Sequence, residues 1–194
     1  MEINTESKYC YKGTSILKNK LGIMNSQKLF EIEKRIVSIK LIALIKKGIT
    51  GEFDINHFKS IHYFLFCDIF DFAGEFRTEN IAKLTFRFAE YEYIESELTR
   101  LLNELKKENY LKDYEYEIFI KKLAYYMAEF NVLHPFREGN GRTYREFIRQ
   151  LALYNGYNLN WSKINRTTIY KATIKAIIDN SELEDVLDNC IEKN

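Results

Sequence analysis

A single proline, Pro135, interrupts the 194 residues of this chain, and its eight glycines are scattered along it. Proline and glycine are the two residues that disfavour a helix most strongly. Most of the chain can therefore run as helix, and we expect a mainly α fold. Hydrophobic residues make up 46% of the composition, which is enough for one substantial core, so we expect a single domain over residues 1–194.

Four segments carry apolar residues at helical spacing. The first, Ser26 to Lys47, predicts an amphipathic helix with Ser26 as its N-cap and Gly48 as its C-terminal stop. Its apolar positions are Leu29, Ile32, Ile36, Ile39, Ile42 and Ala43. Three more helices are expected over residues 55–70, 90–107 and 114–131. Further helices should follow residue 144, with interruptions near 155–156 and 158–161.

Residues 78–88 have a different pattern. Apolar and polar side chains alternate there, in the order Lys83, Leu84, Thr85, Phe86, Arg87 and Phe88. A period of two residues predicts a strand, and the helices on either side make a hairpin on a helical body the simplest arrangement. On this pattern alone, the hairpin is equally well explained as a structural edge and as a functional element.

The balance of charges excludes several classes of partner. Lys and Arg number 29 against 28 Asp and Glu, so the chain has no overall field that would concentrate nucleic acid or anionic lipid. Its three cysteines lack the spacing of a metal site, which fits a reducing compartment. The longest aliphatic run, residues 41–45, is too short to span a membrane, and no secretory signal is found. We therefore expect a soluble, cytoplasmic protein.

The segment from His134 to Arg145 joins two helical patterns through a compact turn. Pro135 should end the first helix and keep His134 out of the α region. Gly139 and Gly141 allow the backbone N–H groups between them to turn inward and form a nest for an anion. The next helix would begin at this nest and would add its own unpaired N–H groups and the positive end of its dipole. A phosphate group could bind there.

Charged side chains surround the predicted nest. Arg142 and Arg145 are three residues apart, so they share a helix face and can present planar forks to phosphate oxygens. Glu138 would be repelled by several phosphates unless a divalent cation such as Mg²⁺ lay between them. Each residue alone has an ordinary structural explanation, but together they fit phosphoryl or nucleotidyl transfer. His57 and His62 are expected to be a surface residue and a helix-packing residue, respectively.

The segment from His134 to Arg145 resembles the signature of the Fic family, His-x-Phe-x-(Asp or Glu)-Gly-Asn-Gly-Arg-x-x-Arg, at every fixed position. The resemblance covers nearly the whole chain. Residues 61–66 and 70–78 are similar to the family's helix and loop before the flap, with Phe72 where tryptophan is more usual. Residues 80–89 are similar to the flap hairpin, and residues 11–23 to the N-terminal segment of Fic toxins and effectors.

The resemblance implies a Fic-type helical bundle with a small β-hairpin flap over the active site. The N-terminal extension would cover residues 1–25, the flap 78–89 and the active-site motif 134–145. It also implies a protein adenylyltransferase that moves AMP from ATP to a Tyr, Ser or Thr hydroxyl of a target protein and releases pyrophosphate. His134 would be the general base, which suits the pKa of imidazole.

The same resemblance implies which residues bind the nucleotide. Glu138 would hold Mg²⁺, and Asn140 would orient the α-phosphate, while Phe136 would anchor the loop. The nucleotide-binding set would be Gly139, Asn140, Gly141, Arg142, Arg145, Tyr170 and the flap residues Leu84, Thr85, Phe86 and Arg87. The flap would also pair with the backbone of the target by strand addition.

Position 141 separates two kinds of chemistry in the family. Relatives that resemble the phage Doc kinases carry lysine there and transfer the γ-phosphoryl group, so Gly141 favours AMP transfer. Two alternatives remain open: a Fic enzyme that uses another nucleotide donor, and a catalytically silent Fic-like binding module.

The resemblance further implies protein partners. Relatives of the toxin kind modify type II topoisomerase subunits, and relatives of the effector kind modify proteins in a host cytosol. Many Fic proteins carry an inhibitory helix with the pattern (Ser or Thr)-x-x-x-Glu-(Gly or Asn), which this chain lacks. The nearest match, from Ser181 to Asp185, offers a shorter acid. We therefore expect a small antitoxin to supply the inhibitory glutamate opposite Arg145.

Overall fold

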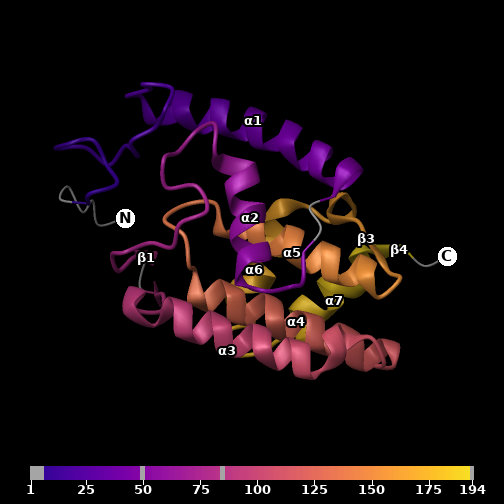
Figure 1. Cartoon of the computed structure of the whole chain (residues 1–194). Helices are drawn as coiled ribbons and strands as arrows, with labels where there is room; N and C mark the ends of the chain where they lie inside the picture. Colours follow the sequence, from indigo (N-terminus) through magenta and orange to yellow (C-terminus); the bar gives the residue numbers. More distant parts are fainter. Residues whose placement is uncertain (1–6, 49–50, 84–85, 193–194) are drawn as a thin grey trace.

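The computed structural model describes residues 7–48, 51–83 and 86–192. Within these ranges the chain forms seven α-helices and two short antiparallel ribbons (Figure 1). The helices are α1 Ser26–Lys47, α2 Ile55–Phe66, α3 Ile94–Lys107, α4 Tyr116–Leu133, α5 Asn140–Tyr154, α6 Arg166–Lys175 and α7 Ser181–Cys190. The strands are β1 Ala82–Lys83, β2 Phe86–Arg87, β3 Asn158–Leu159 and β4 Ile191–Glu192. The expected mainly α fold is confirmed.

The helix ends follow local chemistry. The N-cap of α1 is Asn25 rather than Ser26, because the Asn25 Oδ1 accepts a hydrogen bond from the Lys28 amide. The second helix ends at Phe66 instead of Phe70, since Phe70 turns inward and stacks on Phe72 with ring centroids 4.8 Å apart. The third helix begins at Ile94, after a short 3₁₀ turn.

The buried side of α1 differs from the side that its isoleucines suggest. Leu29, Val37 and Leu44 are buried, whereas Ile39 and Ile42 are 67% and 56% exposed. The buried row also contains Glu33, which forms an ion pair with α5. This ion pair helps to fix which face of α1 packs against the rest of the molecule, and the spacing of the apolar residues alone does not predict that face.

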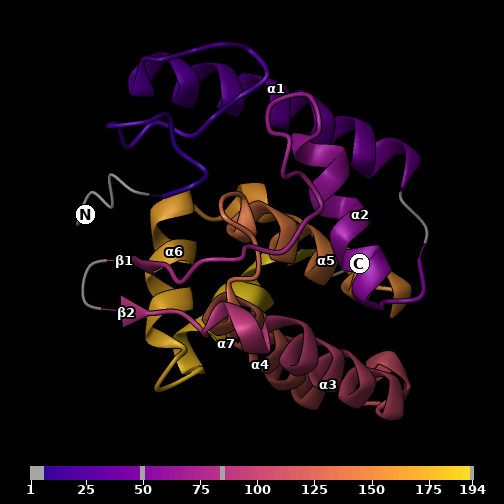
Figure 2. The same cartoon turned by 60° about the vertical axis from the view of Figure 1, so that its left-hand side comes forward.

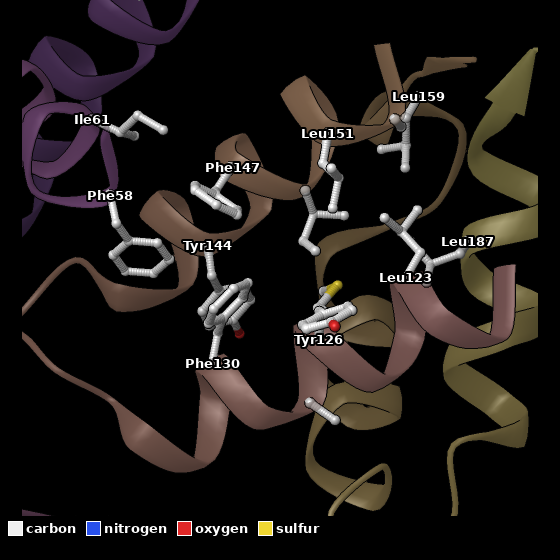
Figure 3. Packing of buried hydrophobic residues seen from close by; sticks show 14 of the residues in the cluster. Phe58, Ile61, Leu123, Tyr126, Phe130, Tyr144, Phe147, Leu151, Leu159 and Leu187 are labelled. Carbon is white, nitrogen blue, oxygen red and sulfur yellow. The ribbon is translucent and has the colours of Figure 1, made fainter. Parts of the chain in front are cut away.

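The centre of the core is an aromatic cluster between α2, α4 and α5 (Figure 3). Phe58 from α2, Phe130 from α4 and Phe147 from α5 meet there, with ring centroids 5.0 to 5.3 Å apart. Burying a side chain of this size contributes about 1.5–3 kcal/mol. Four α5 side chains face this core and are buried, namely Tyr144, Phe147, Ile148 and Leu151.

The predicted hairpin is present as β1 and β2, which pair antiparallel with Ala82 opposite Arg87 and Lys83 opposite Phe86. It extends beside α6 (Figure 2), where the Lys83 Nζ lies 4.4 Å from the centre of the Tyr170 ring. Leu84 and Thr85 lie outside the described residues. The hairpin segment therefore lies between His134, on which Phe88 stacks, and Tyr170 of α6.

After α5 the chain breaks where the sequence predicted. Gly156 has a φ of +85°, which follows the Asn155 cap of α5. β3 then pairs antiparallel with β4, so the segment after α5 is fastened to the segment after α7. None of the helices in the described ranges is long and apolar enough to cross a membrane.

Candidate active site

The link between α4 and α5 places His134 at a helix end. The fourth helix ends at Leu133, one residue before His134, which adopts a left-handed conformation with φ 45° and ψ 58°. Pro135 prevents the helix from continuing, as the sequence predicts. His134 is thus held on the motif loop, where it lines a cavity of about 500 Å³ that we call the histidine cavity.

The surroundings of His134 select one tautomer. Its Nδ1–H donates to the Asn131 carbonyl at 3.1 Å, so Nε2 is the nitrogen that keeps a free lone pair. The Phe88 ring stacks on the imidazole with centroids 3.8 Å apart. Burial lowers the pKa of His134 to about 4. The side chain is therefore neutral at physiological pH and can accept a proton.

The predicted nest lies at the start of α5. Gly139 has a φ of +83°, and a Cβ there would lie 2.4 Å from the Phe66 ring, so only glycine fits. The amide groups of Asn140 and Gly141 have no hydrogen-bond acceptor within the described parts of the chain. Unpaired donors at a helix N-terminus form an anion site. Both residues also line the histidine cavity.

Asn140 shapes the loop from within. Its Oδ1 accepts from the Phe136 amide at 2.8 Å, and its Nδ2 donates to the Phe136 carbonyl at 2.7 Å. Phe136 is fully buried and stacks on His62 at 3.8 Å, which confirms its expected place as the anchor of the loop. The contact of Asn140 with an α-phosphate stays a prediction.

His62 and His57 are both buried, which corrects the expectation for one of them. His62 packs in α2, and its Nε2–H donates to the Glu138 carbonyl at 2.9 Å, while its Nδ1 accepts from the Gly74 amide. His57 was expected on the surface, but it is 3% exposed and its Nε2 lies 2.8 Å from the Gln150 Oε1. The Asp54 cap orients the first turn of α2 so that His57 faces the core.

A cluster of charges lies beside the nest. The Arg142 Nη2 contacts Glu33 Oε1 at 2.5 Å and Glu138 Oε1 at 3.2 Å. Arg145 has no ion-pair partner in the part of the chain that the structure describes, and burial lowers its pKa. Arg166, at the start of α6, lines the same cavity. Three guanidinium groups face two carboxylates, which favours binding of a polyphosphate.

A second cavity adjoins the first. This α1 groove has a volume of about 450 Å³ and lies between the N-terminal segment, α1 and the start of α5. Its apolar lining includes Leu29, Val37 and Leu41. The two cavities share four residues, which are Glu138, Arg142, Arg145 and Arg166. A ligand in either cavity can therefore contact the three arginines.

The flap contributes other residues to the cavity than those predicted. Ile81, Ala82, Lys83 and Phe88 of the flap line it. Tyr170, which was predicted to line the base pocket, lines this cavity from α6. Phe86 and Arg87 lie on β2 without lining the cavity, and Leu84 and Thr85 are not among the described residues. Cover of a nucleotide by the predicted flap residues stays a prediction.

Several site residues were missed by the sequence reasoning. They are Glu33, Arg77, Lys83, Phe88, Asn131 and Arg166. Phe88 stands in the alternating segment, and Asn131 precedes His134 by less than one helical turn, so both had a local signal. Glu33 and Arg166 are far from the motif in sequence, and nothing in their own neighbourhoods marks them.

Comparison with known proteins gives consistent matches. A family model described as Fic/DOC family matches residues 52–152. The protein adenylyltransferase VbhT of Bartonella schoenbuchensis is 39% identical over 174 residues, which are 90% of this chain and 36% of VbhT. The probable protein adenylyltransferase Fic of Salmonella typhimurium is 39% identical over 158 residues, which are 80% of this chain and 77% of that protein.

Solved structures match over nearly the whole chain. The crystal structure of the Bartonella tribocorum effector BepC with bound AMPPNP superposes with a TM-score of 0.91 at 27% identity, and the match covers 98% of this chain and 99% of that one. A Fic domain from Bartonella quintana with bound ADP matches with a TM-score of 0.90 at 28% identity, over 96% of this chain and 95% of that one. The chain spans only about a third of the length of VbhT.

Proposed function

Because this chain belongs to the Fic/DOC family, we propose that it is a protein adenylyltransferase, which moves AMP from ATP to a hydroxyl group of a target protein. One observation carries the proposal most directly. A neutral His134 with a free Nε2 lines the same cavity as the unpaired N–H groups of the nest and the three arginines. A proton acceptor and a polyphosphate site thus share one cavity.

In the proposed reaction, His134 Nε2 takes the proton from a Tyr, Ser or Thr hydroxyl of the target. The hydroxyl oxygen then forms a bond to the α-phosphorus of ATP, and the bond between this phosphorus and the bridging oxygen breaks. Pyrophosphate leaves with the electron pair of that bond. The amides of Asn140 and Gly141 would bind the transferred phosphate, and Arg142, Arg145 and Arg166 would bind the outer phosphates.

Glu138 has the chemistry of a magnesium ligand. Its Oε1 accepts from the Gly139 amide and contacts Arg142, whereas its Oε2 has no partner in the described ranges. The side chain is 44% exposed and lines both cavities, so an oxygen ligand is available for Mg²⁺. Mg²⁺ would neutralise charge on the α- and β-phosphates when ATP is bound.

The target would dock on the flap. A short antiparallel ribbon beside the histidine cavity can accept an extended segment by strand addition, with Phe86 and Arg87 on the available strand. Tyr170 would line the base pocket, where Lys83 already contacts its ring. Targets in the cytoplasm would include type II topoisomerase subunits, and targets in a host cytosol would follow if the chain is delivered as the Bartonella effectors are.

A small antitoxin would restrain the enzyme from the α1 groove. The groove is apolar along α1 and ends at Arg145, which has no carboxylate partner in the described parts of the chain. An amphipathic helix with one glutamate suits this lining. Asp185, the nearest internal candidate, is exposed on α7 and lines neither cavity.

Incubation with α-labelled ATP, Mg²⁺ and a bacterial lysate tests the proposed activity. We expect a labelled protein band. His134→Ala should lower the rate at which this band is labelled by at least about a hundredfold. The His134→Ala variant should still bind ATP, since the imidazole acts on the acceptor hydroxyl.

A panel of UTP, GTP and CTP in the same assay separates the adenylyltransferase from an enzyme with another donor. Binding of ATP without transfer to any protein, in lysates of bacteria and of host cells, would instead identify a binding module. Growth arrest that depends on His134, and that a neighbouring small gene relieves, would support the antitoxin.

A further inference from the structure

Arg77 lies in the loop between α2 and β1, and only 1% of the residue is exposed. Burial lowers the pKa of its guanidinium to about 10, which leaves the group charged at neutral pH. No carboxylate lies within ion-pair distance of it in the described parts of the chain. A buried charge of this kind is costly unless other polar groups replace its water.

Backbone carbonyl groups replace that water. The Arg77 Nε donates to the His134 carbonyl at 2.8 Å, and Nη1 donates to the Glu79 carbonyl at 2.8 Å. Nη2 donates to the Leu133 carbonyl at 3.3 Å and also to the Ala89 carbonyl. The Arg77 amide donates to the Pro135 carbonyl at 2.8 Å.

These five carbonyls belong to two parts of the site. Leu133, His134 and Pro135 form the end of α4 and the left-handed turn that carries the imidazole. Pro135 leaves the last carbonyls of α4 without helical partners, and the negative end of the helix dipole attracts a cation there. Glu79 and Ala89 stand at the two ends of the flap hairpin. One side chain therefore joins both ends of the flap to the backbone of His134.

Two further contacts connect the same parts. The Ala89 amide donates to the Val132 carbonyl at 3.1 Å, and the Phe88 ring stacks on the His134 imidazole. A non-glycine residue in the left-handed region costs about 1–2 kcal/mol, so the conformation of His134 depends on such neighbours.

We propose that Arg77 is a positioning residue that holds the flap and the His134 imidazole in one fixed geometry. The inference rests on the proposed function, in which the flap docks the target and His134 takes the proton of its hydroxyl. Arg77 would set the distance between the flap, where the target docks, and the His134 imidazole, which takes the proton. A lysine would keep the charge, but its single nitrogen cannot span carbonyls that the planar fork of arginine reaches together.

The test compares Arg77→Lys with Arg149→Lys. Arg149 is also buried, at 8% exposed, and its fork binds Glu146 at 2.7 and 2.8 Å, away from the flap and His134. For each variant, NMR measures hydrogen exchange of the Ala89 amide and the titration of the His134 ring nitrogens. Binding of ATP, thermal unfolding and the rate of AMP transfer are measured on the same samples.

For Arg77→Lys we expect faster exchange at Ala89 and a His134 pKa that moves up toward 6.5, with AMP transfer reduced at least about tenfold and ATP binding retained. Arg149→Lys should change neither NMR readout, even where it lowers the unfolding temperature as much. Unchanged Ala89 exchange and His134 titration in folded Arg77→Lys would overturn the inference. Because both NMR readouts are independent of transfer, they remain decisive even if the wild-type chain moves no AMP.

Discussion

His134 depends on neighbours from two other parts of the chain for its chemical state. Asn131, on α4, fixes the proton on Nδ1, and Phe88, beyond β2, covers the ring face. Burial among these groups disfavours the charged form, so the folded-state pKa lies near 4, below the ordinary value of 6.5. The free Nε2 is thus available over the whole physiological pH range. A solvent-exposed histidine would be partly protonated there.

Removal of the Phe88 ring should let water reach the imidazole. We expect Phe88→Ala to raise the pKa of His134 from about 4 toward its ordinary value, which an NMR titration of the free protein measures. The matched control is Phe86→Ala, since Phe86 contacts Phe88 with ring centroids 5.2 Å apart and is not stacked on His134. If the two variants titrate His134 alike, the Phe88 ring does not control its charge.

At the scale of single elements, the start of α5 depends on a glycine that no other residue can replace. Gly139 combines a positive φ with a Cβ position only 2.4 Å from the buried Phe66 ring. Gly156, after the end of the same helix, has a similar φ but open space where its Cβ would lie. Alanine substitutions at the two glycines therefore distinguish the cost of backbone strain, which both would have, from the cost of a steric clash, which only Gly139 would have.

We expect Gly156→Ala to lower the free energy of unfolding by about 1–2 kcal/mol, which is the cost of the left-handed backbone. Gly139→Ala should cost clearly more and should also abolish binding of ATP, because the nest must move away from Phe66. Chemical denaturation and ATP titration measure both effects. Equal losses of stability in the two variants would mean that the loop absorbs the added methyl group.

Helix α1 is tied to the motif through the Glu33–Arg142 ion pair. Burial raises the pKa of Glu33, while the nearby Arg142 acts against this rise. Without Glu33, the Arg142 fork would be free to pair fully with Glu138, the proposed magnesium ligand. We therefore interpret Glu33 as the group that keeps Arg142 turned toward the α1 groove.

Glu33→Gln should lower the free energy of unfolding by about 1–3 kcal/mol, because the Arg142 guanidinium loses a partner that is largely shielded from water. It should also raise the Mg²⁺ concentration needed for half-maximal ATP binding, since Arg142 would compete for Glu138. Glu31→Gln, on the exposed side of the same helix, serves as the control. If the two variants have the same free energy of unfolding and the same Mg²⁺ dependence, the Glu33–Arg142 ion pair contributes to neither stability nor ATP binding.

The sequence was sufficient for the elements and for the residues of one continuous motif. Helical spacing is a local property, so the helices were found, and the bounds of α1 were predicted correctly. The motif places His134, Gly139 and Arg142 together because they are neighbours in the chain. Glu33 and Arg166 reach the site only through packing of distant helices, which local patterns do not encode. The buried face of α1 was missed for the same reason.

At the scale of the whole molecule, the aromatic core is continuous with the site. The stack of Phe58, Phe136 and His62 runs from the packed centre to the motif loop. His62 is fully buried and holds the Glu138 carbonyl and the Gly74 amide with its two ring nitrogens. Only the neutral imidazole can make both bonds, because the charged form has no acceptor nitrogen. The stability of the fold and the shape of the nest therefore depend on one uncharged side chain.

This dependence predicts loss of stability in weak acid. Burial lowers the pKa of His62 to about 3, whereas in the unfolded chain it is near 6.5. Below pH 6.5 the unfolded state therefore binds a proton that the folded state does not. Each such histidine lowers the free energy of unfolding by about 1.4 kcal/mol per pH unit, and His134, whose pKa burial lowers to about 4, adds a similar slope above pH 5.

Denaturation curves between pH 7 and pH 5 measure this slope, in a range above the titration of ordinary carboxylates. His62→Gln should be less stable than the wild type at pH 7, because a Gln amide cannot reproduce both bonds of the ring. Its free energy of unfolding should nevertheless fall less steeply with acid, since the titrating group is gone. A wild-type stability that stays constant from pH 7 to pH 5, or a variant with the full slope, would show that His62 accepts a proton in the folded protein.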